Sequence, residues 1–136
     1  DFGIGRGLAY ADFNNDGCLD LFLVNLGRQA DVGQESKLFE NTCDWGTNWL
    51  QVKTIGTISN TNGIGTQLKI TYGPEAQWRS ISAGGSSMSQ NSLVAHFGLA
   101  NAQILDSLEI HWPSGIIQTL NNIEVNQLIT VTEPQN

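Results

Sequence analysis

The fold class of this chain is decided by residues 49–55, Trp49-Leu50-Gln51-Val52-Lys53-Thr54-Ile55. Apolar and polar side chains alternate along this stretch, as they do along a β-strand with one buried face. Residues 67–72 repeat the alternation, and the turn dipeptide Asn62-Gly63 lies between the two stretches. Further strands are expected at 76–83, 93–97, 105–112, 116–120 and 127–132. Because no stretch has a convincing helical period, the sequence predicts an all-β sandwich or barrel.

Upstream of this region lies a loop rich in short side chains that carry oxygen. Residues 12–20 read Asp12-Phe13-Asn14-Asn15-Asp16-Gly17-Cys18-Leu19-Asp20, a D-x-N-x-D-G-x-x-D spacing. Ca²⁺ takes about 6–8 oxygen ligands at flexible geometry. The expected metal ligands are the side chains of Asp12, Asn14, Asp16 and Asp20 and the backbone carbonyl of Cys18, with water completing the shell. Ca²⁺ is therefore the expected cofactor, and the chemistry of the loop is binding.

The loop differs from an EF-hand, which needs a bidentate Glu where this chain has Leu23. Its flanks, 7–12 and 20–25, read as the two strands of a hairpin, and residues 37–41 as a short third strand. The alternative is an ordinary Asp/Asn/Gly turn that binds nothing. Against that alternative, three carboxylates on one turn repel one another unless a cation lies between them.

The composition limits the classes of partner. The chain has 136 residues, 13 acidic against 6 basic, and a net charge of −7, so nucleic acid is an unexpected partner. No apolar run is long enough to span a bilayer, so no membrane insertion is expected. No signal peptide is present and the chain begins at Asp1, which leads us to expect a processed piece of a longer protein.

The two cysteines, Cys18 and Cys43, leave two interpretations open. One disulfide would tie the calcium loop to the following segment in an oxidising compartment. A chain with two cysteines is equally compatible with two free thiols. The disulfide is slightly favoured, because weak calcium loops belong to the millimolar Ca²⁺ outside the cell.

Residues 5–21 resemble the FG-GAP or VCBS-type repeat, a calcium-loop unit of β-propeller blades. Residues 49–133 resemble the ASPIC/UnbV domain, on marks that lie in the same order along both sequences. These marks are Gly56-Thr57-Ile58-Ser59-Asn60, Gly63-Ile64-Gly65, Ser89-Gln90, His96-Phe97-Gly98-Leu99, Trp112-Pro113-Ser114-Gly115, Asn126-Gln127 and Thr132-Glu133. The two modules in this order resemble the C-terminal end of cartilage acidic protein-like and UnbV-like proteins.

The resemblance implies a partial propeller-blade hairpin with a calcium loop over residues 1–48 and a β-sandwich-like domain over residues 49–136. It also implies a secreted protein, extracellular or periplasmic, with further blade repeats upstream. We expect a calcium-binding, non-enzymatic interaction or adhesion module that meets a protein or glycan partner at a surface. The alternatives are a carbohydrate-binding module and a component of a secondary-metabolite biosynthesis pathway.

Other candidate sites carry less weight. His96 and His111 are expected to be structural, with no acidic residue at ligand spacing. A Ser-His-Asp arrangement could use His96 with Ser86, Ser87 or Ser89. None of these serines lies in the G-x-S-x-G elbow of a hydrolase, so no catalytic residue is assigned. Exposed tryptophans would favour sugar binding, and Trp78 is the first to inspect. The loop from Gly84 to Ser92 is the candidate binding surface of the downstream domain.

Overall fold

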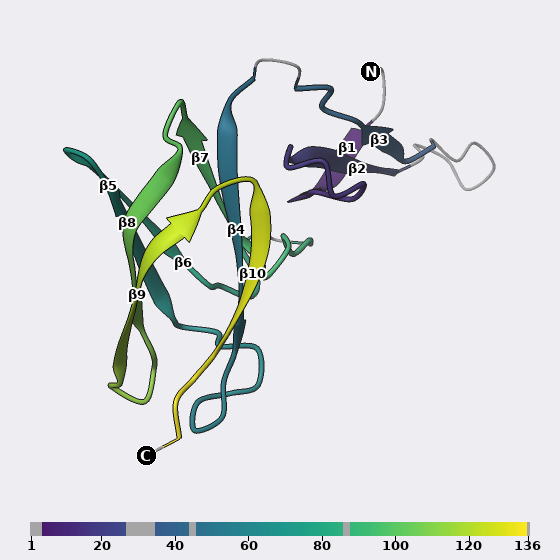
Figure 1. Cartoon of the computed structure of the whole chain (residues 1–136). Helices are drawn as coiled ribbons and strands as arrows, with labels where there is room; N and C mark the ends of the chain where they lie inside the picture. The colour runs from purple at the N-terminus through teal and green to yellow at the C-terminus, as the bar shows by residue number, and fades with distance from the viewer. Residues whose placement is uncertain (1–3, 27–34, 44–45, 86–87, 136) are drawn as a thin grey trace. The chain divides into compact units, whose positions relative to one another are not determined.

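The computed structural model of the chain describes residues 4–26, 35–43, 46–85 and 88–135 (Figure 1). The predicted all-β fold is confirmed, because these residues form ten strands and no helix. The strands are β1 (Ile4–Ala11), β2 (Asp20–Leu26), β3 (Lys37–Phe39), β4 (Asn48–Ile55), β5 (Gln67–Tyr72), β6 (Glu75–Ser80), β7 (Ala95–Ala100), β8 (Ile104–His111), β9 (Ile117–Glu124) and β10 (Gln127–Thr132). Among the residues that the structure describes, no helix has the length and apolarity needed to span a membrane.

The chain divides into two compact units. The first contains Asp1–Cys43 and Ala83–Ser92, and the second contains Asp44–Ser82 and Leu93–Asn136. The expected domains, 1–48 and 49–136, stay a prediction, and the compact units differ from them chiefly at Ala83–Ser92. The sequence pattern placed this segment downstream because it connects two strands of the second unit.

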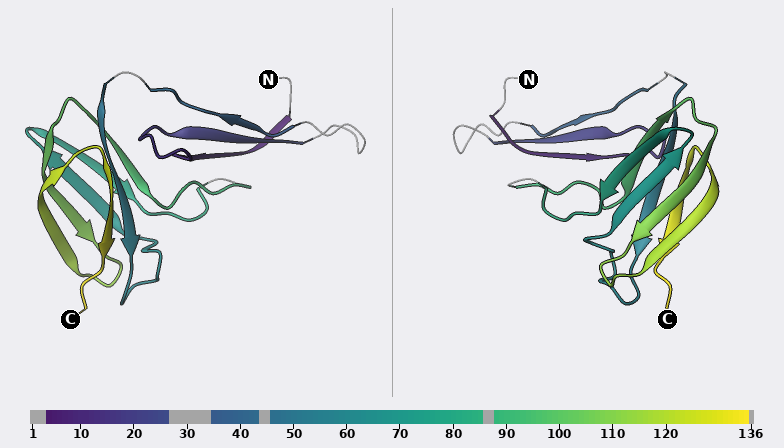
Figure 2. Two further views of the ribbon diagram at one scale, coloured as in Figure 1. Left: turned by 45° about the vertical axis from the view of Figure 1, so that its right-hand side comes forward. Right: turned by 90° about the vertical axis from the view of Figure 1, so that its left-hand side faces the viewer.

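The second unit is a β-sandwich of two sheets, which Figure 2 shows as two layers. One sheet has the strand order β10-β4-β7 and the other the order β6-β5-β8-β9. Strand β4 pairs antiparallel with β7 but parallel with β10, and β10 follows β9 of the other sheet along the chain. Strand β4, at the centre of the first sheet, and β5, an inner strand of the second, are the ones whose alternation predicted the fold.

The two sheets of the second unit enclose a core. Its fully buried side chains are Leu50, Val52, Leu68, Ile70, Phe97, Leu99, Leu105, Leu108 and Ile110, all 0% exposed. Each side chain of this size stabilises the fold by about 1.5–3 kcal/mol when buried rather than exposed. The second unit therefore has a hydrophobic core of its own.

The turn predicted at Asn62-Gly63 depends on the glycine. Gly63 has a φ of +65° and donates its N–H to the carbonyl of Asn60 at 2.8 Å. A Cβ at Gly63 would lie 2.5 Å from Oγ1 of Thr54, so a side chain here would displace β4. This steric limit fixes the connection between β4 and β5.

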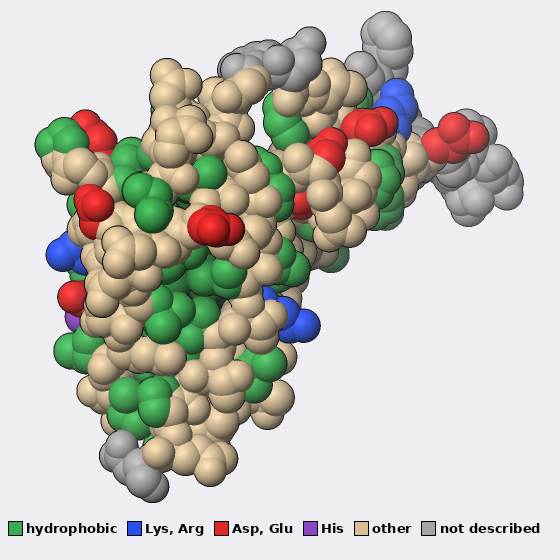
Figure 3. All heavy atoms as spheres, in the orientation of Figure 1, with side chains coloured by type: hydrophobic (Ala, Val, Ile, Leu, Met, Phe, Trp, Pro, Cys, Tyr) green, Lys and Arg blue, Asp and Glu red, His purple; other side chains and the backbone are tan. Residues whose placement is uncertain are grey.

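The first unit contains a three-stranded antiparallel sheet of order β1-β2-β3, and the hairpin predicted around residues 12–20 is β1 and β2. Two rows of paired residues cross the sheet, and consecutive rows face opposite sides. One row is Tyr10, Leu21 and Phe39, and the next is Ala9, Phe22 and Leu38. The five large side chains among these six are 42–51% exposed. Both faces of this sheet are therefore apolar, and Figure 3 shows hydrophobic side chains exposed on this part of the chain.

Candidate functional site

Three of the predicted calcium ligands, Asp12, Asn14 and Asp16, are hydrogen-bonded within one turn between β1 and β2. Asp12 accepts the N–H of Asp16 on Oδ1 at 3.1 Å and the N–H of Gly17 on Oδ2 at 2.9 Å. Asn15 and Gly17 have φ angles of +60° and +90°, so the backbone turns sharply at both residues. These bonds hold the Asp12 carboxylate against the backbone of the turn.

Asn14 and Asp16 are paired within the same turn. Asp16 donates its N–H to Oδ1 of Asn14 at 3.2 Å, and Nδ2 of Asn14 donates to Oδ2 of Asp16 at 2.8 Å. The N–H of Cys18 donates to Oδ1 of Asp16 at 2.8 Å. Local hydrogen bonds of this kind are what short Asx side chains provide in turns.

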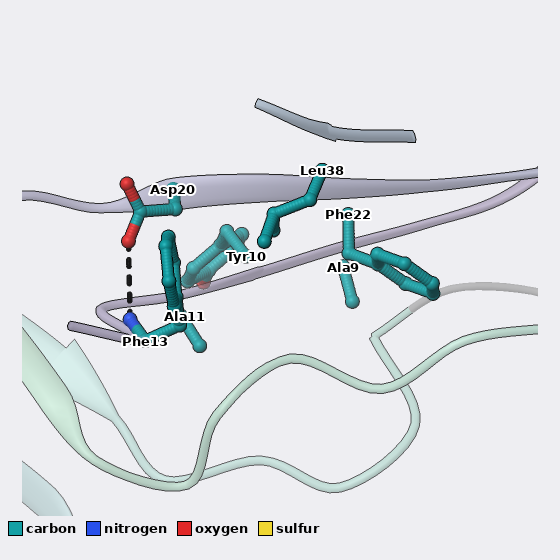
Figure 4. A pocket seen from close by; sticks show the side chains of 7 residues that line it. All are labelled: Ala9, Tyr10, Ala11, Phe13, Asp20, Phe22 and Leu38. Carbon is teal, nitrogen blue, oxygen red and sulfur yellow. Dashed lines mark hydrogen bonds between the residues drawn. The ribbon is translucent and has the colours of Figure 1, made fainter. Parts of the chain in front are cut away.

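Asp20 has a different environment, because it is the first residue of β2 and only 2% exposed. Its Oδ2 accepts the N–H of Phe13 at 3.0 Å, the bond drawn in Figure 4, and its Oδ1 accepts the N–H of Asn41 at 2.8 Å. Cys18 and Cys43 form a disulfide, with their Cα atoms 6.1 Å apart. Asp20 and the disulfide therefore both tie the loop to the segment after β3.

The donor chemistry of this loop fits Ca²⁺. Carboxylate and amide oxygens are the ligands that Ca²⁺ prefers, and each carboxylate oxygen has a second lone pair beyond the one that accepts an N–H. Within residues 4–26, 35–43, 46–85 and 88–135, no three His, Cys, Asp or Glu side chains form a ready group of metal ligands. Asp12, Asn14, Asp16, Asp20 and the Cys18 carbonyl therefore stay a prediction as metal ligands.

A pocket of about 240 Å³ lies on the first unit beside this loop (Figure 4). It follows one face of the sheet, where Ala9 and Ala11 leave space between larger neighbours. The lining residues are Ala9, Tyr10, Ala11, Phe13, Asp20, Phe22 and Leu38. The Asp20 carboxylate is already hydrogen-bonded to backbone, so the pocket offers mainly apolar contacts.

The segment from Gly84 to Ser92, the candidate binding surface, stays a prediction, and its part after residue 87 forms hydrogen bonds with β1. Oγ of Ser89 donates to the carbonyl of Leu8 at 2.6 Å. Tyr10 donates its N–H to Oδ1 of Asn91 at 3.2 Å and accepts the N–H of Ser92 at 3.1 Å. These bonds cover the outer edge of β1, which strand pairing leaves open. The prediction used only the length of this loop, and loop length does not indicate that a segment contacts a strand 81 positions away in sequence.

Some of the residues that mark the resemblance, in three separate segments of the second unit, meet at one buried carboxylate. Glu133 is 1% exposed, and its Oε2 accepts the consecutive N–H groups of Thr57, Ile58 and Ser59 at 2.9, 2.9 and 2.7 Å. Its Oε1 accepts the hydroxyls of Ser59 and Ser114 at 2.8 and 2.6 Å. Three successive N–H groups aimed at one oxygen form an anion-binding nest. The sequence marked these residues but did not reveal that they meet.

The hydrogen bonds keep the Glu133 carboxylate ionised. Burial raises its pKa, but bonds from the Ser114 hydroxyl, the N–H groups of Ser59 and Thr57 and the Ser59 hydroxyl together lower the pKa to about 2. The carboxylate thereby links the β4–β5 loop, the β8–β9 turn and the C-terminal segment. This arrangement stabilises the fold of the second unit.

The sequence predicted that no acidic residue lies at ligand spacing from either histidine, and this prediction is wrong for His111. Glu109 and His111 lie two residues apart on β8, so their side chains point to the same face. Nε2 of His111 is hydrogen-bonded to Oε1 of Glu109. The i, i+2 spacing within a strand was the signal that could have predicted this pair. Ser86 and Ser87, considered as partners of His96, lie outside the described residues.

The tryptophans differ in exposure. Trp112 is 3% exposed and Trp49 is half-buried, whereas Trp78 is 50% exposed. Nε1 of Trp112 donates to Oε1 of Gln118 at 3.1 Å, as expected of a core indole. Trp45 lies outside the described residues.

The second unit is thus a β-sandwich domain in which Thr57, Ile58, Ser59 and Ser114 bind one buried carboxylate, that of Glu133. The family profile described as ASPIC and UnbV matches residues 56–136, and the chain belongs to this family. The matched range includes Glu133 and its partners Thr57, Ile58, Ser59 and Ser114.

The chain is also similar to cartilage acidic protein 1 of several vertebrates. It is 30% identical over 137 residues to the protein of Xenopus tropicalis, a match that covers 97% of this chain and 20% of the relative. The proteins of Mus musculus and Homo sapiens are each 27% identical over 135 residues, covering 98% of this chain and 20% of the relative. The chain thus spans about a fifth of the length of these relatives, and the similarity includes the first unit.

Proposed function

We propose that this chain is a non-enzymatic, calcium-binding interaction module of a secreted protein. The observation that carries the proposal is the loop 12–20, where Asp12, Asn14 and Asp16 share one turn and Asp20 anchors it. The disulfide between Cys18 and Cys43 supports an oxidising compartment, extracellular or periplasmic. The name of the relatives, cartilage acidic protein 1, describes an acidic protein of cartilage. This chain is acidic as well, with a net charge of −7.

In this proposal the metal ligands are the side chains of Asp12, Asn14, Asp16 and Asp20 and the carbonyl of Cys18. A bound Ca²⁺ supplies the positive charge that offsets three neighbouring carboxylates. Backbone N–H groups of the chain itself hold the carboxylates of Asp12, Asp16 and Asp20. Metal affinity would then stabilise the folded first unit.

We further propose that the first unit is an FG-GAP/VCBS-type repeat whose partners are neighbouring blade repeats of the parent protein. The support is the sheet β1-β2-β3, which exposes large apolar side chains on both faces, such as Leu21 on one and Phe22 on the other. A sheet that is apolar on both faces is normally covered on both. The length of the relatives, of which this chain spans about a fifth, leaves room for such repeats.

The test is calorimetric titration of the chain with Ca²⁺, beside the variants Asp16→Ala and Glu75→Ala. Glu75 is an exposed acid of β6, so its variant removes the same charge from the second unit and serves as the matched control. We expect saturable binding with a dissociation constant of about 10⁻⁴–10⁻³ M, the range of extracellular modules. This binding should survive in Glu75→Ala and disappear in Asp16→Ala. Equal binding by both variants, or no heat at millimolar Ca²⁺, would contradict the proposal.

A further inference from the structure

The outer face of the sheet β6-β5-β8-β9 presents a polar surface around one exposed indole. Leu68, Ile70, Leu108 and Ile110 of this sheet are fully buried, so the alternate residues of β5 and β8 face away from the core. A row of paired residues crosses the sheet as Trp78, Lys69, Glu109 and Thr119. The next row is Ser80, Gln67, His111 and Ile117, of which Ile117 is 62% exposed at the far edge of the sheet. We name the set Gln67, Lys69, Trp78, Glu109 and His111 the Trp78 face.

The indole of Trp78 is held in place but left open to solvent. Nζ of Lys69 lies over the ring system of Trp78, 5.5 Å from its centroid, as a cation–π contact. The His111 ring lies 5.8 Å away at an interplanar angle of 49°. The side chain nevertheless remains 50% exposed. A tryptophan that serves the core is buried like Trp112, so the packing of this domain does not account for Trp78.

The surroundings of the ring are polar and carry both kinds of hydrogen-bonding group. Lys69 offers an ammonium donor, Gln67 an amide with donors and an acceptor, and Glu109 a carboxylate acceptor. The hydrogen bond between Glu109 and His111 orients both side chains on this face, where they are 36% and 33% exposed. Strands lie about 4.8 Å apart, so Trp78 and Glu109, two strands apart, are separated by roughly the length of two sugar rings.

We propose that the Trp78 face binds a neutral glycan, with one sugar ring stacked on the indole. A pyranose has an apolar face of C–H groups and a rim of hydroxyls, which matches an exposed aromatic ring with donors and acceptors beside it. Trp78 supplies the stacking surface, Glu109 accepts a hydrogen bond from a sugar hydroxyl, and Lys69 donates a hydrogen bond to a ring or hydroxyl oxygen. This inference rests on the proposed function of an interaction module and names the surface and the ligand class.

Two other ligand classes fit these residues less well. A protein partner needs an apolar interface centre, whereas the strand neighbour of Trp78 is Lys69 and the exposed Ile117 lies three strands away on β9. An anionic polysaccharide would meet the Glu109 carboxylate in the same row and a chain with a net charge of −7. The observations therefore favour an uncharged sugar.

The test is a nuclear magnetic resonance titration of the ¹⁵N-labelled chain with cellohexaose, chitohexaose, mannohexaose and a hyaluronan hexasaccharide. We expect at least one neutral hexasaccharide to shift the indole N–H of Trp78 and the backbone amides of Lys69 and Glu109. The variant Trp78→Ala should bind that sugar about tenfold more weakly or worse, the loss of one aromatic stacking contact. The control Leu128→Ala, which removes a 47% exposed side chain from the other sheet, should bind as the unmodified chain does.

A second variant protects the test if Trp78→Ala fails to fold. Glu109→Gln keeps the side-chain shape, should retain the folded spectrum, and should still weaken sugar binding. The proposal is overturned if no neutral hexasaccharide shifts these signals at about 10 mM, a concentration that detects even millimolar affinity. Tighter binding of hyaluronan, or equal losses in Trp78→Ala and Leu128→Ala, would overturn it too. Calcium binding measured on the same sample separates failure of this proposal from failure of the proposed function.

Discussion

The two units of this chain differ in where their large apolar side chains lie. In the second unit Phe97 of β7 is fully buried between two sheets, whereas in the first unit Phe22 of β2 is 45% exposed on a single sheet. The second unit is stabilised by a core and the first by local ties, namely the disulfide, Asp20 and the segment 88–92. The comparison shows that one short chain can join a unit with a buried hydrophobic core to a unit whose large apolar side chains are exposed.

The largest expected effect tests this comparison with the same substitution in both units. Phe97→Ala should lower the free energy of unfolding by about 3–5 kcal/mol, because it leaves a cavity in a closed core. Phe22→Ala should cost about 1 kcal/mol or less, because its side chain is already half in water. Urea denaturation of both variants measures the difference. Equal losses would mean that the first unit has a closed core after all.

The disulfide should matter only to the first unit. Cys18→Ser with Cys43→Ser removes a link that closes 25 residues of sequence separation, and such links stabilise by about 2–4 kcal/mol. Amide exchange should accelerate in β1 and β2 and stay unchanged in β4 and β5. An acceleration spread over both units would show that the two are stabilised together.

Acid should act on the second unit through Glu133. Its folded-state pKa of about 2 lies below the ordinary value of 4.5, so its contribution to stability is complete above about pH 4.5 and is lost as the pH falls through 2. Glu133→Gln should melt at a lower temperature at neutral pH and lack this part of the acid dependence. Glu124→Gln, a change at an exposed acid of β9, should melt and titrate as the unmodified chain does. Melting curves of the second unit from pH 7 to pH 2 distinguish the two variants.

The smallest expected effect concerns the segment along β1. Asn91→Ala removes the acceptor of the Tyr10 N–H and should destabilise the first unit by about 1 kcal/mol. Local amide exchange at β1 measures this loss. Gln103→Ala, which removes a side-chain hydrogen bond from a turn of the second unit, serves as the control. No change at Tyr10 would show that the segment does not support the sheet.

Features encoded by neighbouring residues could be predicted from the sequence. The alternation at residues 49–55 and 67–72 predicted β4 and β5, and the Asn62-Gly63 dipeptide predicted the turn between them. The Asp, Asn and Gly pattern of residues 12–20 predicted a hairpin loop, which joins β1 to β2. Each of these features depends on backbone preferences within a few residues.

Features that join distant parts of the chain could not be predicted. Glu133 meets Thr57 across 76 positions, and Ser89 meets Leu8 across 81 positions. The parallel pairing of β10 with β4 is equally distant in sequence. Only the folded arrangement creates such contacts, so a single sequence carries no periodic or spacing signal for them.

The most direct test of the difference between the units is amide hydrogen exchange of the whole chain in millimolar Ca²⁺ and in chelator. The proposed calcium dependence predicts that chelation removes protection from β1, β2 and residues 88–92, while β4, β5 and β8 keep theirs. Equal loss of protection in both units, or no loss in either, would contradict it.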